Sequence, residues 1–282
     1  MYFKYLSMHF KSSLEYRHNT FMVTLSSVIV SVGELLAIYV MFKQFETVGN
    51  WGFYESALMF GIITAVFAFA ECFARGYDEF ATLIKNGDLD RMLVRPVNIH
   101  KQIFSSKIEF TKLARFILGI AVCVYSLIKI NITWTFFKVI VLIATFICGV
   151  TVIWGLFMIG AGVSIYTVEN LEFINIITNG SKEISFYPLN IYNKWLTRIF
   201  TFVIPMACFN YLPVTYLLSD GSVSQIWYAL SPFIGILFCI PCLLFLNFSL
   251  KKYQSTGTWL NKKVTSLFVT FFIVLLKMNK KS

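Results

Sequence analysis

The sequence predicts an all-α membrane protein with six transmembrane helices, and three observations support this prediction. The 282-residue chain is 57% hydrophobic and only 13% charged, whereas charged residues make up about a quarter of an ordinary soluble domain. It contains six apolar runs close to the length of about 20 residues that a helix needs to cross the hydrocarbon. Its net charge of +10 comes from basic residues gathered between particular runs, which is typical of a positively charged inner side.

The apolar runs divide the chain into three parts. Residues 1–20 are expected to form an amphipathic helix in the membrane interface, because aromatic and aliphatic residues are interspersed there with Lys4, His9 and Lys11. Residues 21–250 form the six-span domain, and residues 251–282 form a tail whose apolar run is too short to cross comfortably and is expected to lie in the interface or to form a re-entrant segment. The predicted spans are Phe21–Phe42, Ser56–Phe73, Phe116–Ile130, Val139–Ile165, Phe200–Leu218 and Ile226–Leu246.

The basic residues orient these spans in the membrane. If both termini are cytoplasmic, all but three of the 24 Lys and Arg residues lie on the cytoplasmic side, and only Lys43, Lys129 and Lys138 are external. This arrangement makes residues 167–194 a cytoplasmic connection, either a solvated one or a secondary contact for a partner. Topology and attraction to anionic lipid account for the positive charge, so the charge does not indicate nucleic acid.

The motifs of several enzyme classes are missing. The chain has no GxxxxGK[ST] stretch for a nucleoside triphosphate and no GxSxG nucleophile elbow. Its three histidines lack the HExxH spacing and join no cysteine or carboxylate cluster, so no metal site is predicted. The sequence therefore predicts no catalysis and no cofactor on this chain, and it leaves transport or a scaffolding role in the membrane.

The charged loop at residues 76–112 is the largest hydrophilic part of the chain. Asn86-Gly87 is a turn signal, Asp88 can cap a following helix, and Arg95-Pro96 ends it. The predicted helix is short and amphipathic, with Leu89, Met92 and Leu93 on one face and Asp90 and Arg91 beside them. It is either an apolar knob for a soluble partner or a solvated loop whose charges only enforce topology. A second helix, with Ile99, Ile103 and Phe104 on one face, is expected to continue into the third span.

Glu34 is the one carboxylate well inside a predicted span, and an ionised group there is costly enough to suggest function. It either lines a transport pathway or meets a second subunit, or it is a protonated or hydrogen-bonded carboxyl near Ser31 or Tyr39. Glu71 and Arg75, four residues apart, are expected to pair on the surface of the second span.

Two prolines interrupt the predicted fifth span. Pro205 and the stretch Asn210, Tyr211, Leu212, Pro213 should bend or break a helix, because proline removes a backbone donor. The freed backbone groups must be satisfied within the protein or by water. Either an external gate with a short re-entrant turn or a simple kink is predicted there, and Pro205, Asn210, Tyr211 and Pro213 are candidate pathway residues.

The order of several short motifs resembles the permease subunits of the type-2 ABC exporter family. The resemblance covers residues 1–257, and the sequence departs from the family pattern in its tail from Trp259 to Ser282. The motifs are Glu15-Tyr16-Arg17, Trp51-Gly52, residues 87–96, residues 187–192, Ile204-Pro205, residues 210–213 and residues 252–257.

The resemblance implies that residues 87–96 form a coupling helix that docks into a separate ATPase. Leu89, Met92 and Leu93 would then make the apolar contact, and Asp88, Asp90, Arg91 and Arg95 would surround it. It also implies that ATP and Mg²⁺ bind to a dimeric ABC ATPase partner, that a second, related and non-identical permease completes the pathway, and that the site of action is a bacterial plasma membrane. The cargo would be lipophilic or amphipathic, such as a lipid, glycan, peptide or drug, and would move outward.

Three other functions remain open at the level of the sequence. A secondary carrier would use Glu34 to bind a proton, but such carriers usually contain more intramembrane charge and an internal repeat. A membrane enzyme acting on lipid headgroups would need clustered carboxylates or histidines near an interface. A non-transporting immunity or sensor subunit would use the same helices only to bind a partner.

Overall fold

The computed structural model describes residues 2–45, 47–49, 51–167, 172–219 and 226–253. Within these ranges the chain is helical, and its one β contact is an isolated bridge between Val48 and Trp51. This confirms the all-α prediction. The α-helices are α1 (Tyr2–Glu15), α2 (Arg17–Phe45), α3 (Phe53–Asp78), α4 (Phe80–Lys85), α5 (Asp88–Val94), α6 (Ile99–Ser106), α7 (Leu113–Ile130), α8 (Phe136–Thr167), α9 (Glu172–Ile184), α10 (Lys194–Arg198), α11 (Tyr211–Leu218), α12 (Ile226–Leu237) and α13 (Cys239–Lys251).

Five helical stretches in the described ranges are long and apolar enough to cross a membrane. They are Arg17–Phe45, Phe53–Lys85, Phe110–Ile130, Phe136–Thr167 and Ile226–Lys251. Each contains most or all of one predicted span, so five of the six predictions are confirmed as long apolar helices. The sixth predicted span, Phe200–Leu218, lies in a bent pair of segments whose two parts meet at 77°.

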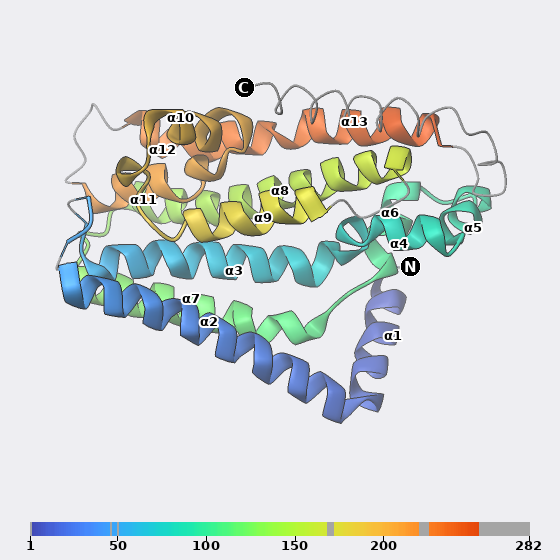
Figure 1. Cartoon of the computed structure of the whole chain (residues 1–282), viewed down its shortest axis with the longest axis horizontal. Helices are drawn as coiled ribbons and strands as arrows, with labels where there is room; N and C mark the ends of the chain where they lie inside the picture. The colour runs from blue at the N-terminus through green and yellow to red at the C-terminus, as the bar shows by residue number, and fades with distance from the viewer. Residues whose placement is uncertain (1, 46, 50, 168–171, 220–225, 254–282) are drawn as a thin grey trace, which may run out of the picture.

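The spans run side by side around α3 and α8 (Figure 1). In α3, 83% of the most apolar stretch is buried, compared with 11% in α2 and in α7. Glycines let α7 approach α3 closely, since a Cβ on Gly119 would lie only 2.6 Å from the backbone nitrogen of Ala65. Small residues at such contacts are the usual means by which membrane helices pack closely.

The bundle has an α5 end and an α11 end. The α5 end carries α1 and the short helices α4, α5 and α6, and the α11 end carries α11 and the loop before α3 (Figure 1). The helix predicted for residues 1–20 is present as α1, which runs across the direction of the spans (Figure 1) and contacts the loop before α7 through Phe10 and Phe110, with ring centroids 5.5 Å apart. The predicted interfacial run in the tail lies outside the described residues.

The connection after α8 crosses the bundle, which corrects the prediction for residues 167–194. Asn175, Thr178 and Asn179 of α9 line a cavity together with Phe67 and Glu71 in the second half of α3. Further along the chain, the Phe186 ring lies 4.9 Å from the Phe60 ring, and the Asn190 side chain donates to the Gly49 carbonyl at 2.6 Å. Residues 175–190 therefore run antiparallel to α3, from the α5 end to the α11 end, and do not remain on one side.

The predicted fifth span is a re-entrant segment at the α11 end. The segment begins near Asn190, which bonds to Gly49, and it returns to the same end at Ser219, whose carbonyl accepts from the Lys138 ammonium at 2.9 Å near the start of α8. The bend falls between Val203 and Met206, around Pro205. Lys194 and Arg198 consequently lie at the α11 end, not with the basic residues of the α5 end.

Candidate functional site

The charged loop folds as the short helix α5, with the boundaries that its turn signals predict. Gly87 precedes it in the left-handed region at φ 70°, a conformation that glycine adopts without strain. Arg95 follows it in an extended conformation, as expected before a proline. Asp88 is the first helical residue instead of the cap, and its carboxylate pairs with the Arg91 guanidinium at 2.6 Å.

The exposed face of α5 differs from the predicted docking face. Leu89 is completely buried, and Met92 is partly buried and packs against the core. Leu93 is 47% exposed and Val94 is 87% exposed. The exposed apolar side chains of α5 are therefore Leu93 and Val94, with exposed Arg91 and Arg95 beside them.

Hydrogen bonds fix α5 to the following helix α6. The Gln102 amide nitrogen donates to the carbonyls of Met92 at 2.9 Å and Val97 at 3.0 Å, which holds both sides of the Arg95-Pro96 break. The prediction that α6 continues into the third span is wrong, because α6 ends at Ser106 and Lys107 is extended. The Lys107 ammonium then pairs with Glu79 at 2.6 Å, beyond the end of α3.

The same loop is joined to the spans by a polar chain. The Tyr77 hydroxyl lies 3.3 Å from His100 Nδ1, and His100 Nε2 lies 2.8 Å from Asn247 Oδ1. This chain connects α3, α6 and α13. Burial and the neighbouring Asp90 carboxylate raise the pKa of Tyr253, just after α13, to about 12. The loop therefore contacts both a central span and the last span.

The ion pairs near the α5 end differ from the predicted pair of Glu71 and Arg75. Glu71 pairs with Arg115 of α7 at 2.6 Å, and its other cation is Lys112 at 3.9 Å. Arg75 instead pairs with Asp78 and Glu79 on its own side and with Glu109 at 3.4 Å. Helical spacing alone gave the wrong partners, because the cross-helix charges of the loop compete for both residues.

Glu34 has a partner that the sequence did not indicate. Its carboxylate pairs with the Lys182 ammonium of α9 at 2.8 Å, and the side chains are 22% and 10% exposed. Its partner in the ion pair is therefore neither Ser31 nor Tyr39. The sequence did not indicate Lys182 as the partner of Glu34, because it predicts that residues 167–194 form a cytoplasmic connection.

The four candidate pathway residues of the predicted fifth span lie in the re-entrant segment and contribute to its structure. Asn210 is buried, and its side-chain nitrogen donates to the Ser185 carbonyl at the end of α9. The Tyr211 ring stacks on Trp51 at 5.5 Å, while Pro213 is buried in α11 and Pro205 precedes a short 3-10 turn. These contacts favour the predicted re-entrant turn over a simple kink.

α9 carries a polar face that extends past Asn179 to Glu183 without a break in the helix. Asn175, Asn179 and Glu183 recur every four residues and are exposed, while Thr178 and Lys182 on the adjoining side of the helix, and Ser181, are buried. The polar cavity beside α9 has a volume of 430 Å³ and is also lined by Glu71, Arg75 and Asp78 of α3. Polar side chains at membrane depth usually face a water-filled space or another protein surface, because exposure to lipid is costly.

No group of three or more metal-ligating side chains occurs among the described residues. The six cysteines form no disulfide, and all except the partly exposed Cys239 are buried.

No curated protein and no solved structure matches the chain significantly. The family model described as ABC-2 family transporter protein matches residues 28–257. With this match and its bundle of membrane-spanning helices, the chain belongs to the ABC-2 transporter family, whose members are multi-pass membrane permease subunits that work with an ABC ATPase.

Proposed function

We propose that this chain is a permease subunit of an ATP-driven exporter and that an ABC ATPase dimer docks on α5. One observation carries this proposal: α5 exposes Leu93 and Val94 while its buried side fixes it to the rest of the protein. ATP and Mg²⁺ would bind to the ATPase. Movement of the docked ATPase would pass through Gln102 and the His100 chain to α3 and α13, because Gln102 ties α5 to α6 and His100 ties α6 to both spans.

We infer that the cargo passes along the polar face of α9. Asn175, Asn179 and Glu183 line a route between the two ends of the bundle, and the ion pair of Lys182 with Glu34 holds α9 against α2 beside that route. A second permease, related and non-identical, would cover this face, since one chain leaves it open. A route with polar side chains inside an apolar bundle suits an amphipathic or lipophilic molecule, such as a lipid, glycan, peptide or drug.

The proposed orientation places the α5 end in the cytoplasm of a bacterial plasma membrane, with outward transport. The basic loop from Arg75 to Arg115 supports it by the positive-inside rule, even with Lys194 and Arg198 at the opposite end. The Glu34 carboxylate is engaged by Lys182, so it is not presented to a pathway as the proton site of a secondary carrier would be.

Val94→Asp tests the docking proposal. Val94 is 87% exposed, so the variant should insert and unfold like the parent protein, as most surface substitutions do. A charge placed in a desolvated apolar contact removes a binding hot spot, so we expect the ATPase to bind at least about 30-fold more weakly. The measurement is co-purification of the ATPase from native membranes with the tagged, solubilised protein.

Ser12→Asp is the matched control, because Ser12 is an exposed residue of α1 at the same end of the bundle. It adds the same charge and should leave co-purification unchanged. Equal recovery of the ATPase with both variants would rule out docking through Val94. Recovery of no ATPase, even with the parent protein, would favour the immunity or sensor function.

A further inference from the structure

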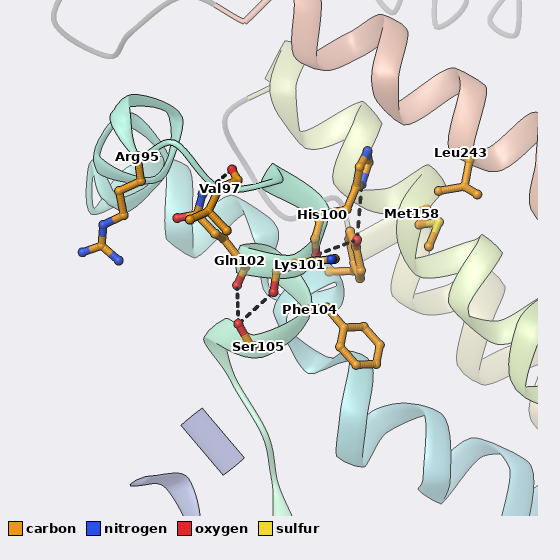
Figure 2. Close-up of a pocket in the computed structure, with 10 residues that line it drawn as sticks. Arg95, Val97, His100, Lys101, Gln102, Phe104, Ser105, Met158 and Leu243 are labelled. Carbon is orange, nitrogen blue, oxygen red and sulfur yellow. Dashed lines mark hydrogen bonds between the residues drawn. The ribbon is translucent and has the colours of Figure 1, made fainter. Parts of the chain in front are cut away.

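A cavity of 590 Å³ lies at the α5 end between α6, the end of α3, α8 and α13 (Figure 2). Its volume falls within the range of about 300–1,000 Å³ that is usual for small-molecule sites. Phe104, Met158 and Leu243 contribute apolar walls. Figure 2 shows Met158 and Leu243 on one side of His100 and Arg95 on the other. The cavity therefore has an apolar region and a basic region.

The basic region lacks compensating carboxylates. Arg95, His100 and Lys101 line it, and the first turn of α6 contains no acidic residue. In the described part of the chain, no carboxylate lies within 4.0 Å of Arg95 or Lys101, whereas Arg75 and Lys107 nearby are paired. The start of a helix also carries partial positive charge. An anion would satisfy both sources of charge at once.

Gln102 adds an unsatisfied acceptor to the same wall. It lines the cavity, is only 9% exposed, and uses its amide nitrogen for Met92 and Val97. Its amide oxygen has no partner within the described ranges. A buried acceptor without a donor is costly, so a hydroxyl on a ligand headgroup would relieve that cost.

The cavity spans the boundary between the loop and the apolar spans. Met158 belongs to α8 and Leu243 to α13, whereas Arg95 and Lys101 belong to the charged loop. Next to Leu243, Ile240 and Leu244 are 55% and 65% exposed, so the apolar wall continues onto the lipid-facing surface of α13. Basic pockets between spans at this level are typical binding places for anionic lipid headgroups.

We propose that this cavity binds an anionic amphiphile through a phosphate group. The phosphate contacts Lys101 and Arg95, and the chain lies along Phe104, Met158 and Leu243. The bound molecule joins the charged loop to α13 next to the contact between His100 and Asn247. Arg95 also borders the α5 face proposed for the ATPase, but the other lining residues do not belong to that face or to the polar face of α9. Lipid binding to this cavity needs no ATPase, so the proposal does not depend on the proposed function.

The test measures lipid binding to the purified full-length protein by native mass spectrometry. The probe is phosphatidylglycerol, with phosphatidylcholine for comparison. Arg95→Gln with Lys101→Gln should weaken phosphatidylglycerol binding by roughly 25-fold, because each basic residue near an anionic headgroup contributes about a fivefold factor. Lys85→Gln with Lys251→Gln removes the same charge from exposed residues outside the cavity and should change binding less than about twofold.

Two further measurements of lipid binding distinguish an amphiphile from a free anion. Leu243→Trp fills the apolar part of the cavity and should weaken phosphatidylglycerol binding. Inorganic phosphate should not displace the lipid at millimolar concentration. Displacement by phosphate with no effect of Leu243→Trp would overturn the proposal in favour of a free-anion site. Equal losses in the two double variants would overturn it in favour of diffuse attraction, and neither result bears on ATPase docking.

Discussion

Lys182→Met is expected to destabilise the protein strongly, because it leaves the Glu34 carboxylate without a cation inside the bundle. Removal of one partner of a fully buried pair costs roughly 3–5 kcal/mol. Glu34 is 22% exposed, so we expect the lower part of that range, about 3 kcal/mol, after allowance for solvent screening. The measurement is the unfolding temperature of the solubilised protein, which should fall by several degrees.

A second substitution separates the loss of charge pairing from simple loss of packing. Lys182→Met combined with Glu34→Gln removes the unpaired charge and should regain most of the lost stability. Lys194→Met is the control, since Lys194 is an exposed lysine nearby on the chain. An unfolding temperature for Lys182→Met equal to that of the control would mean that the pair does not fasten α9 to α2.

Gly76→Val is the second substitution with a large expected effect. A Cβ at Gly76 would overlap the carbonyl oxygen of Ile103 and the hydroxyl of Ser106, so α3 and α6 cannot keep their contact. Overpacking of this kind costs about 1–3 kcal/mol. Because the obstacle is backbone, we expect α6 to move away from α3 and carry α5 with it through Gln102. Stability and ATPase binding should therefore fall together.

Gly33→Val provides a matched control, because Gly33 is also a glycine of a membrane helix and, apart from its own helix backbone, no atom of the described residues lies within 4 Å of its added Cβ. It should keep the unfolding temperature and ATPase co-purification of the parent protein. If Gly76→Val behaves like Gly33→Val in both measurements, the α3 to α6 contact does not position the charged loop.

The sequence predicted best what depends on local chemistry. Long apolar runs located five spans, and Gly87 and Pro96 located both ends of α5, because left-handed backbone and proline act within one or two residues. The prolines around Asn210 likewise indicated a break, which the structure has. These signals need no knowledge of tertiary packing.

The crossing by α9 could not be found by searching for apolar runs. Half of that helix is polar. The carboxylate that pairs with its Lys182 belongs to Glu34, which is 148 positions away in the sequence. The spacing of Asn175, Asn179 and Glu183 was the available signal, because a polar stripe at helical period marks one face. The apolar face of α5 was ambiguous for a related reason: Leu89, Met92, Leu93 and Val94 cover more than one side of a seven-residue helix.

We expect ATP bound to the partner ATPase to change access to the polar face of α9. The most direct measurement uses Asn179→Cys with Cys239→Ala, since the other native cysteines are buried. A membrane-impermeant maleimide is applied from the α5 side to native membranes that contain the ATPase. We expect labelling without nucleotide and protection with a non-hydrolysable ATP analogue, and we expect Val94→Asp to abolish that difference. Equal labelling with and without nucleotide in the parent protein would contradict an ATP-driven route along α9.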